Sequence, residues 1–481
     1  MNYRMVVFVL GRIFLVEAAM MLLPMACSAI YGEWYMLPAF LLPAVILLLL
    51  GLAASLRTPK NTTIYARDGL AIVALVWVLM SAFGALPFVI SGEIPAFADA
   101  FFEMVSGFTT TGSTILNDVE ALSHGALFWR SFSHWVGGMG VLVFAMAVLP
   151  MTDGRAMHLM RAEVPGPTCG KLSSKLSDSA KILYGIYFAM TALEVVFLCA
   201  GGMSLYESLI HSFGTAGTGG FSNRGLSIGA YQNPYFEWVI GIFMLLFGVN
   251  FNLYYFILMR HFREAFGSEE LRAYLGIVLF STVTIAANIL SMVGSVGEAV
   301  RTAFFQVSSI ITTTGYATAD FNVWPGLSRA ILFALMFIGG CAGSTAGGLK
   351  VSRAMILLRT IRREINRLVH PRRVTAVRCD GKALGSEVQR GVSIYFALYC
   401  LCILVAFLCL SGEPFTLETN LSAVVSCFNN VGPGLGAVGP AGSYADYSVL
   451  SKLLLSMAML MGRLEIYPML VALSPSVWRK D

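Results

Sequence analysis

The sequence predicts an all-α polytopic membrane protein with ten transmembrane helices, in which two N-terminal helices precede four pseudo-symmetric helix–pore-loop–helix repeats around one central pore. Two observations support this fold class: apolar segments of bilayer length recur along the chain, and a glycine-containing pattern recurs four times between them. Of the 481 residues, 57% are hydrophobic and 12% are charged. A soluble domain has about 45–50% apolar and about 25% charged residues, so this chain belongs in a bilayer.

Ten segments are long and apolar enough to be predicted as spans. They lie near residues 5–30, 36–56, 69–91, 125–150, 180–202, 235–259, 272–293, 327–349, 388–411 and 447–473. The first is longer than the apolar region of a signal peptide and contains Glu17, so we expect it to stay in place as a helix. The expected divisions of the chain are 1–60 for the two N-terminal helices and 61–160, 161–265, 266–375 and 376–481 for the four repeats.

Basic residues in alternate loops predict the orientation of the spans. The loops 57–67, 151–181 and 260–272 and the segment 350–390 hold most of the Lys and Arg residues, whereas the opposite loops are acidic. By the positive-inside rule both termini are then cytoplasmic, and the net charge of +5 reflects topology rather than nucleic-acid binding. The basic run 353–373 is predicted to be a solvated cytoplasmic helix, with a patch for nucleic acid or anionic lipid as the alternative.

Four outer loops share one pattern, in which about ten apolar residues, too few to span a bilayer, run into small and hydroxyl residues around a glycine. The copies read FFEMVSGFTTTGST at 101–114, IHSFGTAGTGGFS at 210–222, FFQVSSIITTTGYAT at 304–318 and SAVVSCFNNVGPG at 422–434. They align without gaps on Gly112, Gly220, Gly315 and Gly432. Each unit therefore reads as span, half-helix, filter-like strand and span.

This arrangement suits the passage of a cation that loses its water shell. Rings of backbone carbonyls can replace that shell without fixed charge, and the carbonyl ends of half-helices direct partial negative charge at the ion. Extended backbone is tolerated at membrane depth only where protein or water covers it, and glycine permits the angles required. The predicted cation-binding selectivity filter consists of Thr110, Thr111, Gly112, Thr218, Gly219, Gly220, Thr313, Thr314, Gly315, Asn430, Val431 and Gly432.

The eighth span contains five glycines within ten residues, and each costs a helix about 1 kcal/mol relative to alanine, so the helix is expected to break there. The break could be a gating loop beneath the filter or a site of close helix packing on small residues. Arg463 in the last span could act as an electrostatic barrier to cations or pair with Glu465 or Glu194. The predicted gate consists of Gly339, Gly340, Gly343, Ser344, Thr345, Gly347, Gly348 and Arg463.

At these residues the chain resembles the Trk/Ktr/HKT superfamily of potassium transporters, over essentially its whole length. Its size and two additional N-terminal helices are similar to the TrkH/TrkG branch rather than to the shorter KtrB. The matching motifs are HWVGGMG at 134–140, GTGGFSNRG at 217–225, GGCAGSTAGG at 339–348, NNVGPGLG at 429–436 and GRLEIYP at 462–468.

The resemblance implies potassium uptake by a gated, channel-like subunit, with potassium bound at the filter residues. It also implies a homodimer in the bacterial inner membrane, one pore per subunit, and a cytoplasmic TrkA-like partner that carries the regulatory nucleotide. The filter departs from a symmetric potassium filter, because only one of the residues that follow the four glycines is tyrosine. These residues are Ser113, Phe221, Tyr316 and Pro433.

Two other functions can be compared with this one. A potassium symporter driven by protons or sodium should have a carboxylate at its binding site, and Glu194, the obvious mid-span candidate, lies in a helix before a filter. The sequence therefore favours passive, gated flow. A membrane enzyme is not expected, because the sequence has no nucleophile elbow, phosphate loop or metal-ligand spacing, and no cofactor is predicted for this chain. We expect the helix at 350–370 and the loop 151–181 to dock a regulatory ring.

Overall fold

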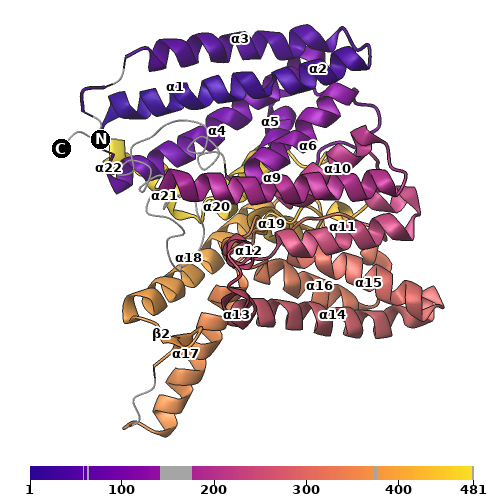
Figure 1. Cartoon of the computed structure of the whole chain (residues 1–481), viewed down its shortest axis with the longest axis vertical. Helices are drawn as coiled ribbons and strands as arrows, with labels where there is room; N and C mark the ends of the chain where they lie inside the picture. Colours follow the sequence, from indigo (N-terminus) through magenta and orange to yellow (C-terminus); the bar gives the residue numbers. More distant parts are fainter. Residues whose placement is uncertain (58, 62–63, 141–175, 373–375, 479–481) are drawn as a thin grey trace.

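The computed structural model describes residues 1–57, 59–61, 64–140, 176–372 and 376–478, which are helical over most of their length (Figure 1). Within these residues, six helical segments are long and apolar enough to cross a membrane. They are Tyr3–Ile30, Met36–Ser55, Arg67–Ser91, Lys181–Ala200, Glu269–Val293 and Ser386–Leu410. Six of the ten predicted spans are thereby confirmed as long apolar helices.

Two of these segments form an N-terminal unit outside the later pattern. Its helices are α1 (Tyr3–Met20), α2 (Leu22–Ile30) and α3 (Met36–Ser55), and Figure 1 shows α1 and α3 lying side by side along one edge of the molecule. The two helices approach closely at Gly11 and Gly51, where a Cβ atom added to Gly51 would lie 2.8 Å from the carbonyl oxygen of Gly11. Large apolar side chains on the other face of α3, such as Leu41 and Leu49, are exposed, as expected for a surface that faces lipid.

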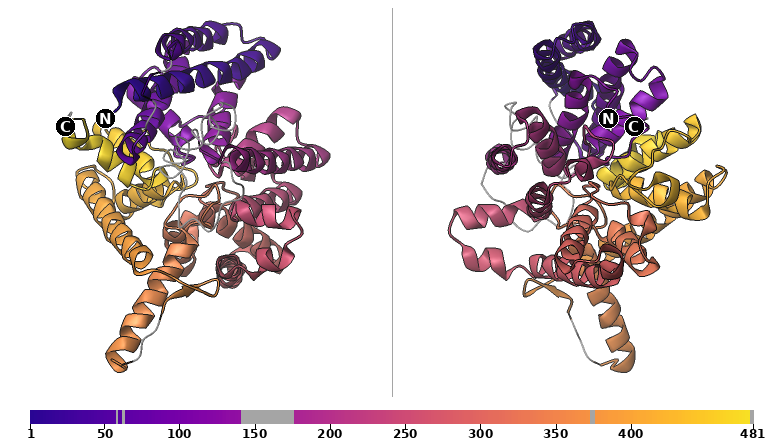
Figure 2. Two further views of the ribbon diagram at one scale, coloured as in Figure 1. Left: turned by 60° about the vertical axis from the view of Figure 1, so that its left-hand side comes forward. Right: turned by 90° about the vertical axis from the view of Figure 1, so that its right-hand side faces the viewer.

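The rest of the chain repeats one order of elements four times: a long helix, a short helix, an irregular segment and a second helix. The long helices are α4 (Ala66–Ser91), α9 (Leu176–Ala200), α14 (Glu269–Val293) and α18 (Ser386–Leu410). The short helices are α5 (Phe97–Phe108), α10 (Leu205–Gly217), α15 (Val296–Ile311) and α19 (Leu417–Asn429). The second helices are α6 (His124–Gly138), α11 (Pro234–Phe247), α16 (Gly326–Ile338) and α20 (Val449–Arg463). In the right-hand view of Figure 2 the four groups follow one another around the centre.

The second helices are shorter than the predicted spans. Helix α11 meets α12 (Phe251–Leu258) at a bend of 91°, and α20 ends at Arg463 before the short helices α21 (Tyr467–Leu473) and α22 (Pro475–Trp478). The prediction of one unbroken helix over each of 235–259 and 447–473 was therefore wrong. The predicted break in the eighth span is confirmed, because α16 ends at Ile338 and the next helix begins at Val351. The end of the span predicted at 125–150 lies outside the described residues, and ten membrane crossings stay a prediction.

Close backbone contacts explain where two of these helices end. A Cβ atom at Gly137 would lie 1.8 Å from the carbonyl oxygen of Phe108, and one at Gly462 would lie 1.9 Å from that of Phe428. In both cases the second helix touches the last turn of the short helix of the same group. A glycine is required at such a crossing, and it also weakens the helix that contains it.

The remaining elements are three further stretches of helix and hairpin near the group that contains α14 and α16, and one 3₁₀ turn in each of the second, third and fourth groups. They are α13 (Phe262–Gly267), α17 (Val351–Val369), the strands β1 (Arg378–Cys379) and β2 (Lys382–Ala383), and the 3₁₀ turns η1 (Ser227–Tyr231), η2 (Phe321–Val323) and η3 (Gly436–Val438). Helix α17 projects from the body (Figure 1) and confirms the helix predicted within the basic segment. The antiparallel hairpin corrects the all-α prediction: Asp380 and Gly381 both have positive φ, as an Asp–Gly hairpin turn requires.

The two ends of the chain meet on one side of the molecule. The hydroxyl of Tyr3 at the start of α1 donates to the carbonyl of Trp478 at the end of α22. An even number of crossings would place both ends on one side, so this contact agrees with the predicted topology. Which side of the membrane they occupy stays a prediction.

Replacing Gly51 by alanine should push α1 and α3 apart, because the new methyl group would meet a backbone carbonyl. We expect a loss of stability of about 1–3 kcal/mol, seen as a lower thermal unfolding midpoint of the purified protein in detergent. The control is Gly276→Ala in α14, where a Cβ atom would meet no other atom of the described chain within 4 Å. Equal midpoints for the two variants would contradict the packing role of Gly51.

Candidate functional site

The four predicted filter segments have the same backbone conformation. Thr110, Thr218, Thr313 and Asn430 have φ of 55°, 56°, 56° and 56°, and the glycine two residues later has φ of 80°, 74°, 84° or 99°. The amide between these two positions donates to the carbonyl five residues earlier, over 2.8–2.9 Å in all four segments. This is a Schellman-type helix end, in which a left-handed residue closes the last turn. The chain therefore leaves each short helix in the same direction relative to that helix.

The four glycines bring the segments together in a closed ring. A Cβ atom added at each glycine would overlap the carbonyl oxygen of the residue before the glycine in the next segment. These distances are 2.0 Å from Gly112 to Gly219, 2.0 Å from Gly220 to Thr314, 2.2 Å from Gly315 to Val431 and 2.6 Å from Gly432 to Thr111. The fourth contact returns to the first segment, so the four segments surround a single axis. All the predicted filter residues lie on these four segments.

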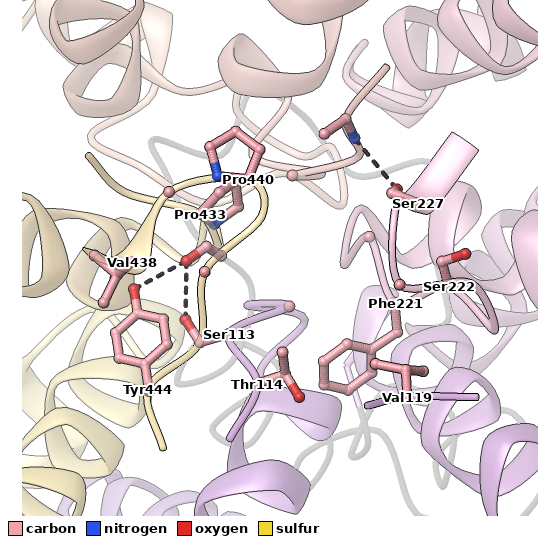
Figure 3. A pocket seen from close by; sticks show the side chains of 18 of the residues that line it. Ser113, Thr114, Val119, Phe221, Ser222, Ser227, Pro433, Val438, Pro440 and Tyr444 are labelled. Carbon is pink, nitrogen blue, oxygen red and sulfur yellow. Dashed lines mark hydrogen bonds between the residues drawn. The ribbon is translucent and has the colours of Figure 1, made fainter. Parts of the chain in front are cut away.

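A cavity of about 540 Å³, including its open mouth, lies at one end of the ring. All four glycines line it, and Figure 3 shows Ser113, Phe221, Pro433 and Tyr444 around it. The short helices end at the ring, so the partial negative charge of each helix C-terminus lies next to the axis. The described part of the ring thus combines backbone oxygens, small residues and helix dipoles without a fixed charge on the filter segments.

Among the described residues, at least one ion pair joins each pair of neighbouring groups. The four pairs are Arg224 with Glu120 at 3.5 Å, Arg301 with Glu237 at 2.9 Å, Arg329 with Glu418, and Lys452 with Asp99 at 2.7 Å. In order they connect the second group to the first, the third to the second, the third to the fourth and the fourth to the first. The polar contacts therefore run around the same ring as the glycine contacts.

A fifth ion pair is buried behind the first two filter segments. Arg130 of α6 and Glu103 of α5 lie 2.5 Å apart and are almost fully buried. Glu103 also accepts hydrogen bonds from the Thr114 hydroxyl and the Ile115 amide, both at 3.0 Å. Arg130 also donates to the carbonyl of Ser222. Its guanidinium carbon lies 3.4 Å from the centre of the neighbouring Phe221 ring. This pair was not predicted from the sequence, although a charged residue inside an apolar segment was an available signal.

The segment that contains most residues of the predicted gate lies against the ring at Thr313. Segment 339–350 is not helical, and the amide of Gly347 donates to the hydroxyl of the predicted filter residue Thr313 over 2.6 Å. The buried carboxylate of Glu270 accepts from the amides of Ala342 at 2.7 Å, near the start of the segment, and of Ser352 at 3.0 Å, just beyond its end in α17. Glu270 was not predicted as a site residue, because its partners are backbone amides remote in sequence.

Arg463 joins this segment to the end of another helix. Its guanidinium donates to the carbonyl of Thr345 at 2.7 Å and to the carbonyls of Gly137 and Gly138 at 2.6 Å. Of the two ion-pair partners considered from the sequence, Glu465 pairs with Arg353 at 2.5 Å. The positive charge of Arg463 therefore lies among backbone carbonyls of segment 339–350 and of the end of α6.

Comparison with known proteins identifies the family. The family model TrkH, described as cation transport protein, matches residues 37–480. The chain belongs to the TrkH family. It is 34% identical over 490 residues to the Trk system potassium uptake protein TrkH of Escherichia coli K12, with complete coverage of both chains, and 35% identical to TrkG of the same organism over 99% of both.

A solved structure gives the same result for the fold of this TrkH family member. The crystal structure of the potassium transporter TrkH from Vibrio parahaemolyticus matches with a TM-score of 0.89 and 33% identity, and the match covers all of both chains. The family is one of transporters rather than enzymes, and its named members are transport system proteins.

Replacing Glu103 by alanine should strongly destabilise the protein, because Arg130 would be left buried without its counter-ion. We expect a loss of about 3 kcal/mol or more, measured as a lower thermal unfolding midpoint in detergent. The matched control is Glu120→Ala, which removes a half-exposed pair and should change stability by about 0.5 kcal/mol or less. A Glu103→Ala midpoint as high as that of the control would show that the buried pair is not required.

Proposed function

We propose that this chain is the membrane subunit of a potassium uptake system and that it conducts potassium through the axis of the glycine ring. The observation that carries the proposal is the closed order of contacts from Gly112 through Gly220 and Gly315 to Gly432, which encloses one path. The names of the relatives, potassium uptake proteins, support the choice of ion. The proposed localisation is the bacterial inner membrane, with both termini in the cytoplasm.

The chemistry is the exchange of water ligands for backbone oxygens. A potassium ion that enters from the outer cavity would lose water and gain carbonyl ligands from the filter segments, while the four helix C-termini favour its positive charge. Neither Asp nor Glu occurs in the segments 110–112, 218–220, 313–315 and 430–432. The site therefore lacks the carboxylate expected of proton- or sodium-coupled symport, and passive flow is the function favoured.

Segment 339–350 and Arg463 are proposed as the gate. An arginine side chain stays charged at any relevant pH, so a guanidinium close to the path raises the energy of a passing cation. Opening would require Arg463 to leave its carbonyl partners and the segment to leave the Glu270 carboxylate and the Thr313 hydroxyl. Because Gly347 contacts Thr313, such a movement would also reach the filter.

Helix α17 is proposed as the attachment for regulation. It begins at Val351, directly after the gate segment, and exposes apolar side chains at a helical spacing. These side chains are Leu358, Ile361, Ile365 and Leu368. An exposed apolar stripe of this kind suits a protein partner. We propose a cytoplasmic TrkA-like subunit that carries the nucleotide, and a homodimer of this chain with one pore in each copy.

Replacing Gly315 by serine should block the filter, because the added Cβ atom would lie 2.2 Å from the Val431 carbonyl at a φ of 84°. We expect potassium and rubidium flux into proteoliposomes to fall by about tenfold or more. The control is Gly297→Ser in the first turn of α15, where the nearest atom would be 4.0 Å away. Undiminished flux in Gly315→Ser would contradict conduction through the ring, and reversal away from the potassium equilibrium potential would favour coupled transport.

Replacing Arg463 by glutamine, or deleting residues 343–348, should raise basal potassium flux by about fivefold or more, because a positive charge or an obstruction leaves the path. Flux would be measured in proteoliposomes that hold the purified protein alone. Arg272→Gln on an exposed part of α14 serves as the charge-matched control. A lower unfolding midpoint with unchanged flux would indicate that Arg463 only stabilises the structure.

A further inference from the structure

The fourth filter glycine differs from the others in what binds its carbonyl oxygen. Three hydroxyl groups donate to the carbonyl of Gly432: Ser426 at 2.8 Å, Tyr444 at 3.0 Å and Ser113 at 3.1 Å. Figure 3 shows the Tyr444 and Ser113 hydroxyls meeting at one oxygen beside Pro433. A carbonyl oxygen has two lone pairs, so three donors occupy its hydrogen-bonding capacity.

The three other glycines lack this arrangement. In the described chain, no hydrogen bond is recorded to the carbonyls of Gly112, Gly220 or Gly315. Ser426 stands six residues before the glycine of the fourth segment. The same position holds Ser106, Gly214 and Ser309 in the first, second and third segments. The Ser309 hydroxyl donates instead to the carbonyl of Tyr316 at 2.6 Å, and the Ser106 hydroxyl has no hydrogen-bond partner among the described residues.

The groups that hold the Gly432 carbonyl are themselves fixed. The Tyr444 amide donates to the carbonyl of Thr114 at 2.8 Å, so the tyrosine is anchored on the first group although it follows the fourth segment. Pro433 restricts the backbone of the residue before it, and Gly432 has the largest φ of the four glycines, 99° against 74–84°. The position of this carbonyl is therefore determined by hydroxyls and backbone from two neighbouring groups.

We propose that the Gly432 carbonyl is a structural acceptor and not an ion ligand. At the level of the four glycines, potassium would then be coordinated by the carbonyls of Gly112, Gly220 and Gly315 alone. Ser113, Ser426 and Tyr444 are positioning residues that keep the fourth oxygen out of the coordination ring and so set selectivity. This inference rests on the proposed function, because it assumes that the ring conducts the ion.

The order of the segments around the ring predicts the direction in which the ion is displaced. The first and third segments are the neighbours of the fourth, so the second lies opposite to it. An ion held by three carbonyls should therefore be displaced from the axis, away from Gly432 and toward Gly220. Anomalous diffraction from rubidium-soaked crystals of the protein measures this displacement directly. A rubidium peak equidistant from the four glycine carbonyls would overturn the inference.

Removal of the hydroxyls provides the functional test. The variant Ser113→Ala/Ser426→Ala/Tyr444→Phe frees the fourth carbonyl, which can then join the ring, and should raise the permeability of potassium relative to sodium by about threefold or more. Tyr444→Phe alone keeps the aromatic ring and should shift the ratio in the same direction. The control is Tyr447→Phe, whose ring centre lies 6.0 Å from that of Tyr444 and whose hydroxyl donates to Asn420.

The permeability ratio comes from reversal potentials with potassium and sodium on opposite sides of the membrane. An unchanged ratio in the triple variant and in Tyr444→Phe, with normal potassium flux, would overturn the inference. An equal shift in Tyr447→Phe would overturn it as well, because the effect would then not depend on the Gly432 carbonyl. Failure of the wild-type protein to conduct potassium would instead contradict the proposed function.

Discussion

The architecture depends on how closely four backbone segments approach one another around a single axis. At each filter glycine the next segment's carbonyl oxygen occupies the place of a Cβ atom, at 2.0–2.6 Å. Such contacts require glycine at these four positions. They also fix the distance between the four short helices that end there. The repeated Schellman-type end has the same consequence, because it sets the direction in which each segment meets its neighbour. The sequences of the groups can therefore diverge widely while these few positions keep the ring closed.

Charge is distributed according to the same geometry. Four of the ion pairs between groups lie around the ring, and the buried pair of Arg130 with Glu103 lies behind its first two segments. A buried charge in a membrane protein is costly unless it is paired and hydrogen-bonded, and Glu103 meets this condition with the Thr114 hydroxyl and the Ile115 amide. These side-chain charges thus lie away from the axis of the ring. On the axis, their electric field would compete with that of the helix dipoles.

Local sequence signals account for what could be predicted. The four segments of the glycine ring were predicted as a filter because hydroxyl residues and glycine recur in register, and the break after Ile338 was predicted because glycines are dense there. The end of α20 gave no such signal, since the residues with positive φ beyond it are Glu465 and Ile466. The partner of each charged residue could not be predicted from the sequence either. Arg353 and Glu465 are 112 residues apart, and only the fold brings them together. Spacing along the chain identifies the segments, but not the contacts between them.

The four segments share a backbone and differ in what their side chains do. The third carries Thr313, which accepts a hydrogen bond from the proposed gate, and Tyr316, whose hydroxyl donates to the carbonyls of His211 and Phe221 in the second group. The fourth has its glycine carbonyl held by three hydroxyls. In a ring of four identical subunits, every change of side chain would appear four times. A single chain with four unequal copies can join one segment to segment 339–350 and fix the glycine carbonyl of another, because each contact is encoded separately.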